Sequence, residues 1–138
     1  MHRMRTLLCL CAGLLLAACA TLPAPPVTMP SGLVYQSLRE GSGAPPAASD
    51  TVKVHYRGTF PDGREFDSSH SRGQPSEFPL NRVIKCWTEG VGMMKPGGKA
   101  RLVCPPQIAY GERGSGGGVI PPNATLHFEV ELIEVLRK

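Results

Sequence analysis

Short runs of β-forming residues, separated by glycine and proline, make up most of this chain and leave little room for long helices. Sixteen of its 138 residues are glycine and 14 are proline. Proline lacks a backbone N–H and glycine favours turns, so both interrupt regular structure. Aromatic and branched residues recur inside the runs, as is typical of strands. The pattern predicts a sheet of short strands joined by turns.

Alternating polarity locates the strands. We expect them at residues 32–38, 51–60, 64–67, 78–80, 99–104 and 125–136. In the second of these, Val52, Val54 and Tyr56 fall on one face, so this strand is expected to be half-buried. Residues 83–94 instead place apolar side chains at helical spacing, and Pro96 ends that helix. One helix beside many antiparallel strands gives an α+β fold.

Residues 1–18 are expected to be a signal peptide that is removed on export. Two arginines precede an apolar stretch, Leu7–Ala18, which is too short to span a bilayer. The stretch ends in Leu-Ala-Ala-Cys, which resembles the bacterial lipobox, where the cysteine (here Cys19) receives lipid and becomes the mature N-terminus. An ordinary cleaved signal and an uncleaved anchor are the alternatives. Ala20 stands where an Asp retains enterobacterial lipoproteins in the inner membrane, so we expect a lipid-anchored periplasmic protein at the outer membrane.

The segment that follows the lipobox is rich in proline and alanine and has no apolar period. Residues 19–31 are therefore expected to form an extended, semi-rigid tether from the lipidated Cys19. The remaining residues, 32–138, are expected to form a single domain.

Export also decides how the remaining cysteines are interpreted. Cys86 and Cys104 are the two left after the signal peptide and the lipidated residue are set aside. In an oxidising compartment a disulfide between them is the expected state. The alternative is two free thiols that fill core volume.

Several kinds of chemistry are excluded by the sequence. The formal charge of +4 includes two arginines before residue 18, and without them 13 basic residues face 11 acidic ones. Those charges are dispersed, so we expect no nucleic-acid partner. The glycines at 114–118 lack a following Lys-Ser/Thr pair, and the four histidines have no ligand spacing, so we expect no phosphate loop, metal or cofactor. No nucleophile–base pair stands out, and a reaction that is only rotation about a bond needs none.

Four motifs, in a fixed order, resemble one family. They are VHYRGTFPDGREFDSS (54–69), FPLNRVIKCWTEGV (78–91), PPQIAYGERG (105–114) and VIPPNATLHFEVEL (119–132). Together they resemble the FKBP-type peptidyl-prolyl cis–trans isomerases, also called rotamases, over residues 32–138. The resemblance implies a five- or six-stranded antiparallel sheet wrapped around one short helix, with a pocket between the two. It also implies that Cys86, at the helix start, lies near Cys104, at a strand end.

The resemblance implies a set of pocket residues. The catalytic residues carried over are Tyr56, Phe66, Asp67, Ile84 and Tyr110, and the substrate-binding residues are Phe78, Val83, Trp87, Ile120 and Phe128. Trp87 would form the floor, the Ile84 N–H and the Tyr110 hydroxyl would bind substrate carbonyls, and Asp67 would be a polar acceptor at the rim. On periodicity alone, Trp87 and Phe128 are better explained as ordinary core residues, and it is the resemblance that favours a binding role for them. Ser76 departs from the often aromatic residue of eukaryotic members and lowers one wall.

The implied activity is isomerisation of X–Pro bonds in exported proteins that fold in the periplasm. The family's macrolide inhibitors, such as rapamycin, are expected to bind the same pocket, and no cofactor is needed. We expect a monomer, because the long helical dimerisation segment of some bacterial relatives is not seen. The alternative function is a chaperone or adhesion module that binds proline-containing segments with little turnover.

Overall fold

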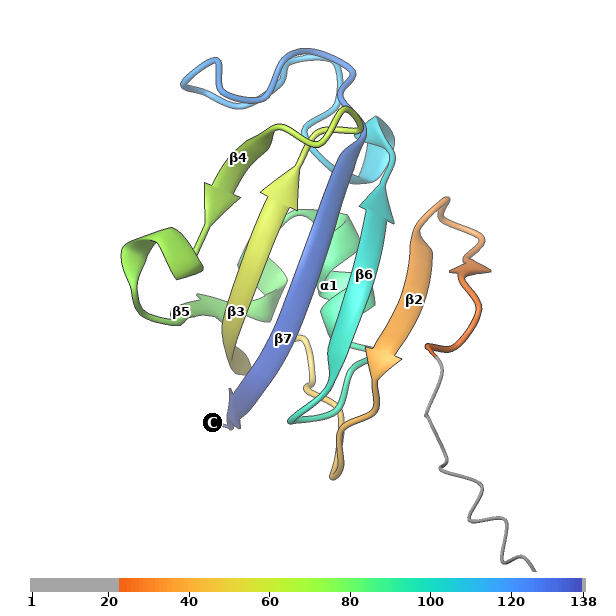
Figure 1. Cartoon of the computed structure of the whole chain (residues 1–138), viewed down its shortest axis with the longest axis vertical. Coiled ribbons are helices and arrows are strands. Elements are labelled where there is room, and N and C mark those ends of the chain that lie inside the picture. The colour runs from red at the N-terminus through yellow and green to blue at the C-terminus, as the bar shows by residue number, and fades with distance from the viewer. Residues whose placement is uncertain (1–22, 138) are drawn as a thin grey trace, which may run out of the picture.

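An antiparallel sheet with one short α-helix on one face forms the described part of the chain, residues 23–137 of a computed structural model (Figure 1). The seven strands are β1 (Val27–Thr28), β2 (Val34–Arg39), β3 (Thr51–Thr59), β4 (Glu65–Ser68), β5 (Ser76–Pro79), β6 (Lys99–Cys104) and β7 (Leu126–Leu136). The helix is α1 (Lys85–Val91), and three 3-10 turns are η1 (His70–Arg72), η2 (Leu80–Arg82) and η3 (Pro106–Ile108). The predicted signal peptide and Cys19 lie outside the described residues.

The strand order is β1-β2-β6-β7-β3-β4, and β5 also pairs with β3. One edge of β3 therefore carries two short partners. Residues 51–54 pair with β5 and residues 57–59 pair with β4, while the other edge of β3 pairs with β7 along its whole length. The predicted α+β class is confirmed, and the six expected strands are all present.

The seventh strand, β1, corrects the predicted tether. Val27 and Thr28 pair with Tyr35 and Val34 of β2, and the Ala24 N–H donates to the Ser37 carbonyl at 3.1 Å. The segment therefore lies on the domain from residue 24 onward. The reason is that β2 would otherwise end the sheet with unpaired backbone groups, which this segment satisfies. Proline and alanine content alone does not reveal such a docking.

The core fills the space between the sheet and α1, which lies behind β7 and β6 in Figure 1. Val52, Val54 and Tyr56 alternate with exposed or half-buried neighbours along β3, as predicted from the sequence. Gly90 allows α1 to approach β6 closely, because a Cβ there would lie 2.7 Å from a Leu102 methyl group. No helix within residues 23–137 has the length and apolar character to cross a membrane.

The helix is shorter than the predicted 83–94. It begins after Ile84, whose backbone is extended (φ −57°, ψ 149°), and its last residue is Val91. The next residues form tight turns instead, in which the N–H of Met93 and of Met94 each donate to a carbonyl three residues earlier. Glycines at 90 and 92 weaken the last turn, because glycine favours the unfolded chain more than other residues do.

A disulfide joins Cys86, in the first turn of α1, to Cys104, the last residue of β6. The two Cα atoms are 5.8 Å apart, within the normal range for such a bond. Both residues are fully buried. The bond therefore ties the start of the helix to the strand that leads into η3.

We predict that protein exported to an oxidising compartment and purified without reductant contains no free thiol at these two positions. The bond closes a loop of 18 residues, which corresponds to about 3 kcal/mol in the chain-entropy model. Reduction should lower the melting temperature by roughly 10 °C. Thiol titration under denaturing, non-reducing conditions checks the bond. The Cys86→Ala/Cys104→Ala variant is the control, and its melting temperature should not respond to reductant. Two titratable thiols in the native protein would contradict the prediction.

Candidate functional site

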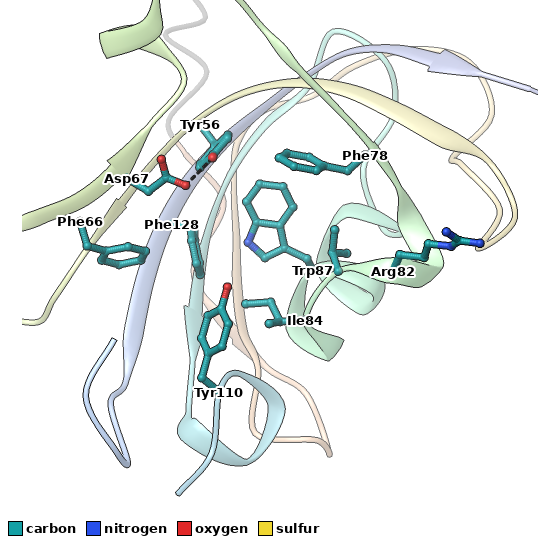
Figure 2. Close-up of a pocket in the computed structure, with 10 residues that line it drawn as sticks. Tyr56, Phe66, Asp67, Phe78, Arg82, Ile84, Trp87, Tyr110 and Phe128 are labelled. Atoms are coloured by element: carbon teal, nitrogen blue, oxygen red, sulfur yellow. Dashed lines mark hydrogen bonds between the residues drawn. The ribbon is translucent and has the colours of Figure 1, made fainter. Parts of the chain in front are cut away.

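A pocket of about 350 Å³ opens between the concave face of the sheet and the start of α1 (Figure 2). Its lining residues are Tyr56, Phe66, Asp67, Phe78, Arg82, Val83, Ile84, Trp87, Tyr110 and Phe128. The structure thus brings nine of the ten predicted site residues together around one cavity. Ile120 is the exception, and Arg82 is an addition that the sequence did not predict.

Ile120 is buried in the core cluster and does not line the pocket. The loop that carries it is closed by its own hydrogen bonds: the Ser115 N–H donates to the Ile120 carbonyl at 3.0 Å, and the Ile120 N–H donates to the Ser115 hydroxyl at 2.9 Å. This closure fixes Ile120 toward the core. The prediction that it contacts substrate is therefore not supported by its position.

Trp87 forms the floor and is only 4% exposed. Three rings meet it nearly at right angles: Tyr56 at 5.1 Å, Phe128 at 5.4 Å and Phe78 at 5.7 Å between centroids. Perpendicular contacts of this kind are favoured by the aromatic quadrupoles. The floor is therefore held from three sides by rings that come from β3, β5 and β7.

The indole N–H of Trp87 is buried and has no hydrogen-bond partner among the described residues. Figure 2 shows the indole nitrogen on the side of the ring that faces Phe128. The two rings are at 86° to each other, and the floor of the pocket thus contains one donor unpaired within residues 23–137 that a bound ligand or water could satisfy.

A polar network centred on Arg72 joins the hydroxyl of Tyr56 to the carboxylate of Asp67 at the rim of the pocket. The Tyr56 hydroxyl donates to Asp67 Oδ2 at 2.5 Å. Arg72 donates to Asp67 Oδ1 at 2.7 Å, to the Tyr56 hydroxyl at 2.9 Å and to Ser76 Oγ at 3.2 Å. The sequence did not identify Arg72, because the polar segment around it looked like an irregular loop. Instead η1 and Gly73, at φ 73°, fold it back onto β3 and β4.

The network sets the ionisation of its members. Burial raises the pKa of the Asp67 carboxyl, but the hydrogen bonds from Tyr56 and Arg72 outweigh that cost and hold the pKa below its usual range. Burial and the hydrogen bond to Asp67 raise the pKa of the Tyr56 hydroxyl. At neutral pH the site therefore contains a paired carboxylate and a protonated phenol, and neither group is suited to accept or release a proton.

Two further donors have no acceptor within the described residues. Ile84 caps α1, and its carbonyl accepts bonds from Trp87 and Thr88, whereas its N–H is not used. Tyr110 lies two residues after the end of η3, and the residue is 41% exposed. Its hydroxyl points into the pocket (Figure 2). A bound carbonyl can satisfy either donor. Among residues 23–137 there is no cluster of His, Cys, Asp or Glu that is arranged to hold a metal ion.

The carboxylate network gives a test that does not depend on turnover. We expect Arg72→Gln to raise the pKa of Asp67, because the cation is lost while the burial remains. A lowered pKa on folding stabilises the folded protein above the unfolded pKa, and this contribution is lost as pH falls through the folded pKa. The variant should therefore lose the network at a higher pH than the wild type. Carboxyl NMR titration measures the shift. Arg64→Gln, whose partner Asp62 lies on an exposed turn, is the control, and an unchanged Asp67 titration in Arg72→Gln would contradict the expectation.

Comparisons with known proteins agree with this geometry. Residues 42–133 match the model of the FKBP-type peptidyl-prolyl cis-trans isomerase domain. The chain is 54% identical over 108 residues to the FKBP-type isomerase FkpA of Escherichia coli K12, covering 78% of this chain and 39% of that protein. It is 49% identical over 111 residues to the isomerase Mip of Coxiella burnetii, covering 80% of this chain and 48% of that protein.

Solved structures show the same fold. The crystal structure of E. coli FkpA matches with a TM-score of 0.77 and 52% identity over 80% of this chain and 51% of that chain. An isomerase from Pseudomonas syringae matches with a TM-score of 0.75 and 40% identity over 81% of each chain. The chain spans about two fifths to one half of the length of these curated relatives. It belongs to the FKBP-type peptidyl-prolyl cis–trans isomerase family.

Proposed function

We propose that this domain isomerises X–Pro bonds of exported proteins and so assists their folding in the periplasm. The observation that carries the proposal is the pairing of an aromatic floor with two unused donors, the Ile84 N–H and the Tyr110 hydroxyl. A proline ring on Trp87 would place the carbonyls of its flanking residues within the same cavity. The relatives that carry this domain are named as isomerases.

The chemistry follows from the nature of the barrier. Rotation about an X–Pro bond costs roughly 18–20 kcal/mol because twisting the amide removes its resonance. The twisted amide has a less polarised carbonyl and is therefore less dependent on water. An apolar pocket that binds it better than the planar form lowers the barrier, and that difference is the whole catalytic requirement.

Each part of the site has a role in this scheme. The rings around Trp87 remove water from the amide, and the donors at Ile84 and Tyr110 hold carbonyls on either side of it. Asp67 contributes a fixed polar edge at the rim, and its charge is already balanced by Arg72. No proton has to move, which agrees with the shifted pKa values of Asp67 and Tyr56.

We predict that Phe66→Ala lowers kcat/KM for a proline peptide at least tenfold, which corresponds to about 1.4 kcal/mol of transition-state stabilisation. Phe66 forms one wall and packs edge-on against Phe128 at 5.6 Å. Tyr35→Ala is the control, because Tyr35 is also a partly buried aromatic but does not line the pocket. Asp67→Ala should have an effect of similar size to that of Phe66→Ala. Full turnover by folded Phe66→Ala would show that the site is assigned wrongly.

The same assays separate the enzyme from a binding module. Refolding of a proline-limited protein, with and without the domain, reports catalysis directly. Strong peptide binding with negligible turnover would instead identify a chaperone or adhesion module. Rapamycin should compete with peptide for the pocket in either case.

We also propose that the chain is lipidated at Cys19, exported and held at the outer membrane as a monomer. The support is the Leu-Ala-Ala-Cys sequence after a short apolar stretch, and Ala20 in place of Asp. Only residues 20–22 separate Cys19 from the described chain, so the reach from Cys19 to Pro23 is at most about 14 Å. The lipid would hold the β1–β2 edge near the membrane. The strands that carry Phe66, Asp67 and Phe78 lie at the opposite edge of the sheet.

We predict that Cys19→Ala abolishes lipidation and releases any processed protein into the soluble periplasm. Mass spectrometry of the mature N-terminus and membrane fractionation measure this outcome. One acyl chain binds membranes only marginally, so stable anchoring requires the several chains that bacterial lipoprotein processing adds. The matched variant Ala20→Asp should remain lipidated but move to the inner membrane. An unmodified Cys19 in the wild-type protein would refute lipidation.

A further inference from the structure

The two sides of the pocket rim differ in net charge. On one side, Arg72 lies 2.7 Å from Asp67 and balances its carboxylate. On the other side, Arg82 lines the pocket, is exposed and forms no ion pair within residues 23–137. The rim therefore presents one unbalanced positive charge, and it lies at the end of η2, two residues before Ile84.

The direction of the Arg82 side chain limits what its charge can contact. Figure 2 shows the Arg82 guanidinium directed away from Trp87 and out of the pocket, while Arg82 remains one of the residues that line it. A proline ring on Trp87 is therefore out of its reach. The backbone of residues 83 and 84 is extended and leads from Arg82 to the Ile84 N–H. A substrate strand bound to that N–H could therefore pass close to Arg82 as it left the pocket.

We propose that Arg82 is a specificity-determining residue that favours substrates with a carboxylate side chain about two residues from the proline, on the flank that crosses Ile84. The inference rests on the proposed isomerase function and deepens it. A guanidinium binds carboxylates with directed, charge-assisted hydrogen bonds. Both groups remain in contact with water, so the preference is modest. Exposed ion pairs of this kind correspond to about two- to fivefold in affinity.

The effect belongs to binding and not to the chemical step. Arg82 does not contact the rotating amide, so its interaction is equally strong in the bound substrate and in the transition state. An interaction of that kind lowers KM and leaves kcat unchanged. It is also screened by salt, because the Debye length falls to about 3 Å at 1 M.

The test uses peptides that are identical except for Glu, Gln or Lys placed two residues from the proline, on each flank in turn. kcat and KM are measured by isomerisation, and Kd is measured by the fluorescence of Trp87, which is the chain's single tryptophan. On the flank that crosses Ile84, the wild type should bind the Glu peptide about two- to fivefold more tightly than the Gln peptide. It should bind the Lys peptide more weakly than the Gln peptide. In Arg82→Gln the three affinities should become equal. Lys95→Gln, which removes an exposed charge outside the pocket, should keep the wild-type order.

The outcomes separate this inference from the proposed function. Turnover of the Gln peptide tests isomerase activity alone, and the Kd series tests the charge preference whether or not turnover occurs. Equal affinities for Glu and Lys peptides on both flanks of the wild type would overturn the role of Arg82. A preference that persists in Arg82→Gln would also overturn it, as would one that appears in kcat instead of KM.

Discussion

The pairing of β3 with β7 is the constraint on which the pocket depends. All nine residues of β3 have a partner on β7, and the other edge of β3 carries β5 and then β4. Apart from Tyr110, which follows η3, the rings at the pocket wall and floor come from these four strands and from α1. A one-residue slip of β3 would turn Tyr56 and Val54 to the solvent face and leave Trp87 without its nearest aromatic neighbour. The register of a single strand pair thus determines whether the site exists.

Gly58 shows how closely that register is matched to the site. It lies on β3 opposite Phe128 and Asp67. A Cβ at this position would lie 2.5 Å from the Phe66 ring and 3.0 Å from the Phe128 ring. The absent side chain is what allows both rings to fold over the strand and meet edge-on. Glycine in a strand interior is unfavourable on its own, and here the wall of the pocket depends on it.

Alternation along the chain was enough to predict β3, β6 and β7, because each has one buried face and one polar face. The same signal is absent from β1, whose two exposed residues are held by backbone bonds that no side-chain pattern reveals. The helix was predicted too long because Met94 is buried at helical spacing, although its backbone has already left the helix.

The site residues divide in the same way. Periodicity alone favoured a core role for Trp87 and Phe128. The structure gives them both roles, since each is at most 5% exposed and each lines the cavity. Their pocket role came from family resemblance and not from periodicity. The sequence did not predict Arg72 or Arg82 as site residues, because the pattern around a charged residue in a polar segment does not indicate which side chains will lie next to it in the fold.

The disulfide and the aromatic packing stabilise the site in different ways. Cys86 precedes Trp87, and Cys104 precedes the turn that carries Tyr110, so the bond links the segments that supply both free donors. A cross-link acts mainly by restricting the unfolded chain, whereas the shape of the folded site comes from contacts. Trp87, Val91 and Met94 of α1 and the turn after it are buried, and the close approach of Leu102 to Gly90 brings α1 near β6. The bond therefore adds to the free energy of unfolding, while the position of the Ile84 N–H, at the start of α1, is set by the packing of Trp87 and the rest of the helix against the sheet.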